Sequence, residues 1–283
     1  MSINKVMVVG SGQMGAGIAQ VFAKAGKQVY FNDISEEILM GNIVKIDKQL
    51  ASQVKKERLT EAEKEDMMSR ILPSTTYESA KEVDLVVEAA TERKDIKLSI
   101  FKQLDEMAPA HTILATNTSS LSITEIALAT KRPDKVIGMH FFNPAPVMKL
   151  VEVISGLTTS EETQATIKEL TTAIGKTGVE VRDSFGFVVN RILIPMINEA
   201  SFVLGENVAT AEEIDQAMKL GANHPLGPLA LGDLIGLDVV AAIMNVLYEG
   251  FKDPKYRVSP LIQKYVEAGW LGRKTGKGFF DYN

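Results

Sequence analysis

The chain has 283 residues, of which 45% are hydrophobic and 24% are charged, a composition typical of globular proteins and a length that favours two domains. Its formal net charge of -5 argues against a nucleic-acid-binding face over the whole surface, so we expect no nucleic-acid partner. The absence of cysteine excludes disulfides and thiolate metal sites, and we expect no metal centre. Without a signal-peptide core or an apolar run of membrane-spanning length, the sequence predicts a cytoplasmic protein with no membrane partner.

The first predicted unit is a strand, a glycine-rich turn and a helix. The valine-rich strand Lys5–Val9 leads into Gly10-Ser11-Gly12-Gln13-Met14-Gly15, and a helical pattern follows. In a dinucleotide-binding fingerprint the first glycine permits the turn, the second lets a pyrophosphate approach the backbone, and the third lets the helix pack on the strand. The motif alone is a weak signal, because glycine-rich turns also occur in loops that bind nothing.

A carboxylate follows the second predicted strand, Gln28–Asn32. Asp33 comes 23 residues after Gly10, where a ribose-binding acidic residue belongs. Such a carboxylate accepts hydrogen bonds from the adenosine ribose hydroxyls and repels a 2′-phosphate, which favours NAD over NADP. The alternative is that Asp33 only caps the next helix.

Residues 36–70 are charged and strongly helical, and they predict a helical hairpin that breaks near Thr60. Thr60 and Glu63 form a capping-box pattern that would restart the second helix. Lys55, Lys56 and Arg58 cluster just before this break. A solvated face and a binding site for ligand phosphates are both open interpretations of this cluster.

Polar residues follow two further predicted strands. Glu92 and Lys97 come after the strand at residues 83–88, and the small polar run 116–120 comes after the strand at residues 113–115. Because strand ends line the cofactor crevice in doubly wound sheets, both groups are candidates for that crevice. The alternatives are a surface salt bridge for Glu92 and Lys97, and a helix cap for the polar run.

His140 and Glu152 stand on either side of a predicted reversal of the chain. His140 directly follows a predicted strand at residues 136–139, Glu152 lies in another at residues 150–154, and the prolines at Pro144 and Pro146 force a turn between them. The reversal would bring the carboxylate within hydrogen-bonding reach of the imidazole, fixing its tautomer and making a general acid/base. A buried structural histidine is the alternative.

The alternation of strands and helices predicts an α/β fold with a doubly wound, mostly parallel sheet in residues 1–182, and a second domain in residues 183–283. In the second domain we expect a long apolar helix at residues 187–204, with Asn190 near its start. Residues 221–231, rich in glycine and proline, are expected to be a loop before another helix. The basic, glycine-rich segment at residues 270–280 is interpreted either as a tail or as a segment from which Lys274 reaches a cofactor.

Five segments in this order resemble the short-chain L-3-hydroxyacyl-CoA dehydrogenases: GSGQMGAGIAQ, NTSSLSITEIA, HFFNPAPVMKLVEVI, DSFGFVVNRI and GRKTGKGFF. The resemblance covers essentially the whole chain, and in length the chain is most similar to the bacterial 3-hydroxybutyryl-CoA dehydrogenases. It implies a Rossmann-type NAD-binding domain, an all-helical C-terminal domain for substrate binding and dimerisation, and a homodimer formed through that second domain.

The resemblance also implies a reaction and a set of residues. NAD(H) would exchange hydride with C3 of a short acyl-CoA, converting acetoacetyl-CoA and (S)-3-hydroxybutyryl-CoA. His140 would be the general acid/base, Glu152 its orienting partner, and Ser119 and Asn190 contacts to the substrate oxygens. The residues expected to bind NAD are Gly10, Gly12, Gln13, Met14, Gly15, Asp33, Glu92, Lys97, Asn117, Ser119, Asn143 and Lys274. Those expected to bind substrate are Ser119, Asn143 and Asn190, with Lys55 and Lys56 proposed for the coenzyme A phosphates.

Two other functions stand beside this one. The chain could be an NAD-dependent dehydrogenase of a 3-hydroxy acid that carries no coenzyme A, because related folds act on sugar acids and the cluster Lys55, Lys56 and Arg58 points only weakly to coenzyme A. It could also be a nucleotide-binding protein that keeps the fold without turnover. The presence of His140, Glu152, Ser119 and Asn190 counts against the second possibility.

Overall fold

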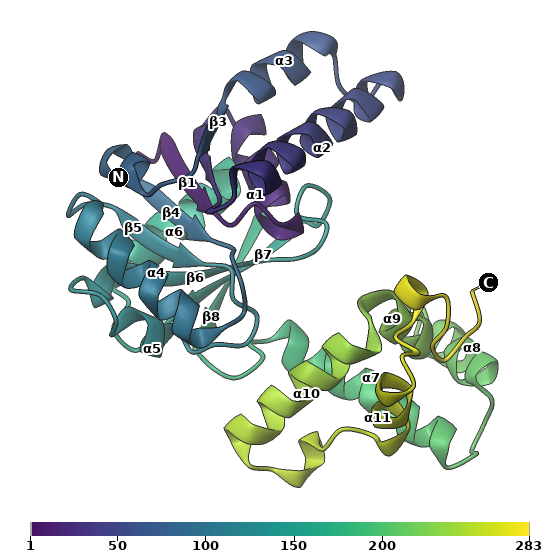
Figure 1. Ribbon diagram of the computed structural model, residues 1–283. Helices are drawn as coiled ribbons and strands as arrows, with labels where there is room; N and C mark the ends of the chain where they lie inside the picture. Colours follow the sequence, from purple (N-terminus) through teal and green to yellow (C-terminus); the bar gives the residue numbers. More distant parts are fainter. Residues whose placement is uncertain (1, 283) are drawn as a thin grey trace. The chain divides into compact units, whose positions relative to one another are not determined.

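A computed structural model describes residues 2–282, and the chain divides into two compact units, one ending at Ser184 and the other beginning at Phe185 (Figure 1). The first unit holds an eight-stranded sheet with helices, and the described residues of the second form helices and no named strand. The predicted fold class, a Rossmann-type α/β unit followed by an all-helical one, is confirmed.

The sheet of the first unit is mostly parallel. Its strands lie in the order β3-β2-β1-β4-β5-β6-β7-β8. The six strands β1 to β6 pair in parallel, whereas β7 runs antiparallel to β6 and β8 runs parallel to β7. The order reverses between β1 and β4, and ligands of open α/β sheets bind outside the carboxyl ends of the strands at such a point. The strands are β1 (Lys5–Val9), β2 (Gln28–Asn32), β3 (Ile71–Ser74), β4 (Leu85–Glu88), β5 (Ile113–Thr116), β6 (Val136–Phe141), β7 (Leu150–Ser155) and β8 (Thr177–Arg182).

Helices cover both faces of this sheet (Figure 1). Because successive strand residues point to opposite faces, Val6 and Val8 of β1 share one apolar cluster with Phe22 of α1 and Ile167 of α6. The helices α4 and α5 lie on the other face (Figure 1). The helices are α1 (Gln13–Lys24), α2 (Glu36–Lys55), α3 (Glu61–Ser69), α4 (Lys94–Met107), α5 (Ile123–Ala127) and α6 (Glu161–Ala173), with short 3-10 helices at Glu78–Glu82 and Pro133–Lys135.

The helices α2 and α3 form the predicted hairpin. The backbone N–H of Glu63 donates to Thr60 Oγ1 at 3.2 Å, and the N–H of Thr60 donates to Glu63 Oε2 at 2.7 Å. This reciprocal pair starts α3 at Glu61, as the capping box predicted. The strand β3 that follows was not predicted from the sequence.

The second unit has two apolar clusters, one around Ile197 of α7 and Leu237, Val240 and Met244 of α10, and a smaller one that includes Ile214 of α8. The expectation that residues 221–231 form a loop is wrong at its end, because α9 begins at Pro228. Asp215 of α8 explains this start, since its carboxylate accepts hydrogen bonds from the first N–H groups of α9. The helices are α7 (Val189–Gly205), α8 (Ala211–Gly221), α9 (Pro228–Ile235), α10 (Leu237–Phe251) and α11 (Pro260–Glu267), with 3-10 helices at Pro254–Tyr256 and Arg273–Thr275.

The glycine-rich C-terminal segment is packed within the second unit and is not a loose tail. The buried carboxylate of Asp233 in α9 accepts hydrogen bonds from the N–H groups of Phe279 and Phe280, at 2.9 and 3.0 Å, and from the hydroxyl of Tyr282 at 3.0 Å. These three bonds fix the segment that carries Lys274.

Within residues 2–282, no single helix has both the length and the apolar character needed to cross a membrane. Taken together, α9 and α10 meet that test by length and composition, but they are bent by 97° at the break between them.

Candidate active site

The glycine loop after β1 is shaped by two close backbone contacts and one open position. Gly10 has φ +97°, and a Cβ there would lie 2.6 Å from Cα of Ala90, while a Cβ on Gly15 would lie 1.8 Å from the carbonyl oxygen of Gly10. Gly10 and Gly15 are therefore required by the fold itself. A Cβ on Gly12 would meet no atom within 4 Å in the described chain.

Gly12 is also the N-cap of α1, and no side chain of residues 2–282 caps this helix. The first N–H groups of a helix lack partners within it and carry the positive end of the helix dipole. An open glycine in front of such an end suits a pyrophosphate. Gln13 and Met14 form the first turn of α1 behind it. The loop thus fits the predicted dinucleotide.

Asp33 lies beside this loop. Its Oδ2 accepts hydrogen bonds from the N–H and Oγ of Ser11, at 2.8 and 2.7 Å, and its Oδ1 accepts from the N–H of Ser35 at 3.2 Å. Partial burial raises the pKa of Asp33, but the donors of Ser11 and Ser35 outweigh it and hold the pKa below its usual value. The interpretation of Asp33 as the helix cap is wrong, because Ser35 caps α2. The ionised carboxylate has further lone pairs for ribose hydroxyls.

Glu92 organises the polar loop after β5. Its Oε1 accepts hydrogen bonds from Thr118 Oγ1 at 2.6 Å, from the N–H of Ser119 at 2.9 Å and from Ser120 Oγ at 2.8 Å. Burial raises the pKa of Glu92, but the charge of Lys97 and the hydroxyl donors of Thr118 and Ser120 lower it by more. The pKa of Glu92 therefore lies below its ordinary value. The carboxylate therefore sets the position of Ser119.

Lys97 makes a buried ion pair that the sequence reasoning missed. Its Nζ lies 2.8 and 2.7 Å from the two carboxylate oxygens of Glu88, and 3.6 Å from Glu92 Oε2. Glu88 also accepts from Thr116 Oγ1 at 2.8 Å. Both Glu88 and Lys97 are fully buried, so the alternative of a surface salt bridge does not describe Lys97. A charged residue ending the otherwise apolar strand β4 was the available signal.

His140 and Glu152 meet as the sequence predicted. They are directly opposite residues of the antiparallel pair β6 and β7, and His140 Nδ1 lies 2.8 Å from Glu152 Oε2. Directly opposite residues project on the same face of a sheet, so the pairing itself brings the two side chains together. The exposed fractions are 6% for His140 and 1% for Glu152, which shields the pair from water. The strand β6 extends to Phe141, two residues beyond its predicted end.

Two asparagines connect this pair to the rest of the site. Asn117 Oδ1 accepts a hydrogen bond at 2.8 Å from the N–H of Phe141, next to His140, which ties the polar loop to β6. Asn143 Oδ1 accepts from Gln13 Nε2 at 3.1 Å, which ties the loop after β6 to the start of α1. The first unit thus links the glycine loop, the polar loop and β6, which carries His140, through direct hydrogen bonds.

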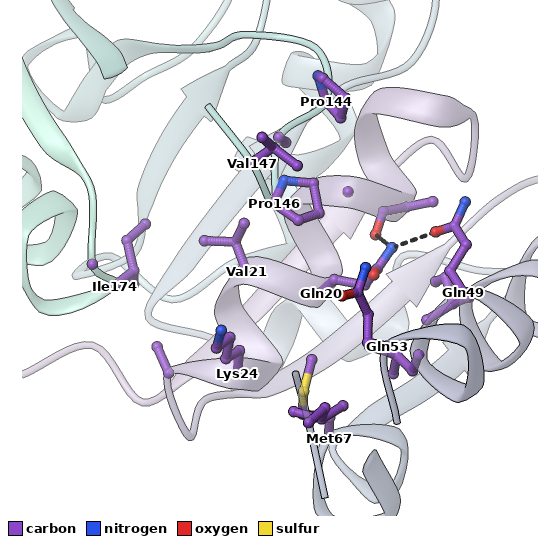
Figure 2. A pocket seen from close by; sticks show the side chains of 18 of the residues that line it. Gln20, Val21, Lys24, Gln49, Gln53, Met67, Pro144, Pro146, Val147 and Ile174 are labelled. Atoms are coloured by element: carbon purple, nitrogen blue, oxygen red, sulfur yellow. Dashed lines mark hydrogen bonds between the residues drawn. The ribbon is translucent and has the colours of Figure 1, made fainter. Parts of the chain in front are cut away.

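A cavity of about 960 Å³ opens beside Asn143, between α1, α2, the loop after β6 and the turn before β8 (Figure 2). Figure 2 shows Gln20 of α1 and Gln49 of α2 joined by a hydrogen bond, 3.2 Å long, across its wall. The predicted phosphate ligands Lys55 and Lys56 are exposed at the end of α2 and are not among the described residues that line it. The cationic side chains that do line it are Lys24, Lys45, Arg58 and Lys176.

Two predicted site residues belong to the second unit. Asn190 is the half-buried second residue of α7. Lys274 lies in the 3-10 helix Arg273–Thr275, with Nζ at 2.6 and 2.7 Å from the carboxylate oxygens of Asp238 at the start of α10. The contact with Asp238 thus holds Lys274 within the second unit.

Two family models cover almost the whole chain. Residues 5–184 match the model described as 3-hydroxyacyl-CoA dehydrogenase, NAD binding domain, and residues 186–282 match 3-hydroxyacyl-CoA dehydrogenase, C-terminal domain. A 3-hydroxybutyryl-CoA dehydrogenase from Clostridioides difficile is 57% identical over 279 residues, 99% of each chain. A probable 3-hydroxybutyryl-CoA dehydrogenase from Bacillus subtilis is 55% identical, covering 100% of this chain and 98% of the relative.

A solved structure agrees with these sequence relatives. The crystal structure of (S)-3-hydroxybutyryl-CoA dehydrogenase from Ralstonia eutropha has a TM-score of 0.97 and 52% identity, with full coverage of both chains. The matches extend across both units, and the glycine loop and the His140–Glu152 pair stand within the matched residues. The chain therefore belongs to the 3-hydroxyacyl-CoA dehydrogenase family.

Proposed function

We propose that this protein is an NAD-dependent dehydrogenase that transfers hydride between NAD(H) and C3 of a short acyl-CoA, with acetoacetyl-CoA and (S)-3-hydroxybutyryl-CoA as its substrate pair. The observation that carries this proposal is the buried His140–Glu152 pair, 2.8 Å apart, in the unit that holds the dinucleotide-type glycine loop. The names of the similar bacterial enzymes support the same substrate class.

His140 performs the proton transfer in this proposal. NADH, when bound, supplies the hydride to C3, and NAD⁺ accepts it in the reverse direction. Glu152 holds Nδ1 of His140, so the proton exchanged with the C3 oxygen passes through Nε2. In reduction the imidazolium form of His140 gives its Nε2 proton to the developing alkoxide, and in oxidation the neutral imidazole takes the hydroxyl proton at Nε2. Ser119 and Asn190 act as hydrogen-bond donors to the substrate oxygens and stabilise charge there.

The chain's own residues favour NAD over NADP. Gly12 and the uncapped start of α1 suit the pyrophosphate, and Asp33 presents an ionised carboxylate beside it. A 2′-phosphate near that carboxylate would be repelled. We assign Asn117, Ser119, Asn143 and Lys274 to the nicotinamide end of the cofactor site, and Glu92 and Lys97 to its support.

The cavity beside Asn143 is the proposed site for the phosphorylated arm of coenzyme A. It lies against α2 of the helical hairpin, where the phosphates were expected, and its cationic lining suits their charge. Lys24, Lys45 and Arg58 line the cavity, whereas Lys55 and Lys56 are exposed at the end of α2 and do not line it. We therefore propose Lys24, Lys45 and Arg58, ahead of Lys55 and Lys56, as the residues that contact the phosphates.

The two units have separate proposed roles, NAD binding by the first and substrate binding and dimerisation by the second. The second unit exposes large apolar side chains, among them Ile192, Val208 and Leu220, and exposed apolar surface of this kind suits a subunit interface. We accordingly infer a homodimer formed through this unit. We also propose that the enzyme works in the cytoplasm.

An NADH oxidation assay tests this function. Steady-state rates at the NADH absorbance band should be high with acetoacetyl-CoA and low with acetoacetate, which lacks the coenzyme A arm. NADPH in place of NADH should give a much lower kcat/KM. Equal rates with acetoacetate would favour the dehydrogenase of a free 3-hydroxy acid. No turnover with either substrate, together with intact NADH binding, would favour a non-catalytic nucleotide-binding protein.

A further inference from the structure

One of the four cations that line the cavity is bound to the protein backbone. The Nζ of Lys176 lies 2.7 Å from the carbonyl oxygen of Ala145, 2.7 Å from that of Met148 and 3.4 Å from that of Pro146. A lysine ammonium has three N–H donors, so these three carbonyls occupy its donor capacity. Lys176 therefore has a different task from a cation that offers its donors to a ligand phosphate.

The backbone around Lys176 is itself fixed. Its N–H donates to the carbonyl oxygen of Thr171 at 3.0 Å, and the next residue, Thr177, begins β8 and donates to the carbonyl oxygen of Lys149 at 2.8 Å. Lys176 thus lies in a turn whose backbone is hydrogen-bonded to α6 on one side and to the strand β7 side of the sheet on the other. Burial lowers the pKa of Lys176, with a smaller contribution from the charge of Lys24.

The carbonyls that Lys176 binds belong to the loop between β6 and β7, which begins beside His140. This loop packs closely on α1, because a Cβ on Gly17 would lie 3.0 Å from Cβ of Ala145 and 3.1 Å from Cδ of Pro146. Figure 2 shows Pro146 and Val147 over the helix that carries Val21. At the start of the loop, Asn143 accepts its hydrogen bond from Gln13.

We propose that Lys176 is a positioning residue for the reaction: by binding three carbonyls of residues 145–148 it holds the loop that presents Asn143, and it does not bind coenzyme A phosphate directly. The proposal rests on the proposed function in one respect, the assignment of Asn143 to the cofactor and substrate. Without the ammonium, three carbonyl oxygens at the cavity wall would lose their donors, and the loop would rearrange to reach water.

A double-mutant cycle tests this inference. Lys176→Met should lower kcat/KM with NADH and acetoacetyl-CoA by about tenfold, a loss of the size expected when a charged hydrogen-bond donor is removed. Asn143→Ala should lower it by a similar or larger factor. The double variant should be no worse than Asn143→Ala alone, because both changes remove the same positioned amide. Lys176→Met should also weaken NADH binding in a fluorescence titration.

Matched variants separate positioning from charge and from general damage. Lys168→Met removes an exposed lysine of α6 that pairs with Glu180, and it should leave rates and NADH affinity unchanged. Lys176→Arg keeps charge and N–H donors and should recover most of the rate. Lys45→Met removes another lining cation and should raise the KM for acetoacetyl-CoA with little change in NADH affinity. If Lys176→Met does not fold, Lys176→Gln replaces it in the cycle.

The inference would be overturned if the double variant lost kcat/KM by the product of the two single factors. It would also be overturned if Lys176→Met, like Lys45→Met, changed only the KM for acetoacetyl-CoA and did so in a salt-sensitive way. Failure of the proposed function looks different, because the unmodified protein would then not oxidise NADH with acetoacetyl-CoA. In that case the cycle is read from NADH affinities, where additive losses still contradict the coupling of Lys176 to Asn143.

Discussion

At the residue scale, the position of His140 follows from strand pairing and from one side chain on a neighbouring loop. Glu152 holds its Nδ1 from the opposite strand, and Asn117 binds the N–H of the next residue, Phe141. The contact between His140 and Glu152 could be predicted because two prolines between short apolar runs enforce a reversal. Glu88 and Lys176 could not be predicted in the same way, since Glu88 meets Lys97 only when α4 packs on the sheet, and Lys176 binds carbonyls of a separate loop.

Replacing Glu152 with glutamine tests the orienting role. The variant keeps the shape of the side chain but loses the carboxylate that favours one imidazole orientation, so kcat should fall at least about tenfold. The affinity for NADH should stay close to that of the unmodified protein. Steady-state kinetics and a fluorescence titration measure the two quantities. An unchanged kcat would show that the imidazole does not depend on this carboxylate.

Replacing Glu92 with glutamine tests the charge that orders the polar loop. The folded pKa of Glu92 is lowered from 4.5, so its ionised form stabilises the folded state above pH 4.5. This contribution is lost as the pH falls through the lowered folded pKa. The Tm of the unmodified protein should exceed that of the variant at neutral pH, and the difference should shrink below pH 4.5. A Tm difference that stays constant with pH would contradict this account.

At the scale of elements, the strands and helices that carry the glycine loop followed directly from sequence patterns, whereas β3 and α9 did not. The strand β3 has only four residues with Pro73 inside it, and it lies at the edge of the sheet, where a proline is tolerated. The helix α9 starts with Gly227-Pro228, which reads as a turn. Its N–H groups are capped by Asp215 from another helix, a contact that no local pattern contains.

Replacing Gly12 or Gly15 of the glycine loop after β1 with alanine should have different effects on stability and NADH binding. Gly12→Ala adds a methyl group where the described chain leaves open space, so the Tm should be unchanged and NADH binding should weaken, because the methyl group occupies the approach of the pyrophosphate. Gly15→Ala forces a Cβ against the carbonyl of Gly10 and should lower both Tm and NADH affinity. Thermal melts and NADH titrations compare them. Normal NADH binding by Gly12→Ala would contradict the assigned cofactor position.

At the scale of the whole molecule, the sequence resemblance and the family models describe the same arrangement, a dinucleotide-binding unit followed by a helical one. The family resemblance predicted the fold of both units, and the glycine, polar and histidine motifs lie at the ends of β1, β5 and β6. The phosphate contacts stay a prediction: the sequence cluster Lys55, Lys56 and Arg58 lies in one segment, whereas the cations that line the cavity come from four separate segments and include Arg58.

The inferred homodimer also concerns the whole molecule. Exposed apolar side chains of the second unit, including Leu220 at 76% exposure, should be covered by a second copy of the chain. Sedimentation equilibrium at micromolar concentration should therefore give twice the chain mass of 30.9 kDa. A mass equal to one chain across that range would contradict the dimer and leave the catalytic proposal untouched.

The most direct test of the account is turnover by a His140→Gln variant. If His140 exchanges the proton with the C3 oxygen, NADH oxidation with acetoacetyl-CoA should fall by at least about a hundredfold, within the range that general acid–base catalysis contributes. NADH should bind the variant nearly as tightly as it binds the unmodified protein, because the glycine loop and Asp33 are intact. Full activity with acetoacetyl-CoA in the folded variant would contradict the assignment of His140 as the general acid/base.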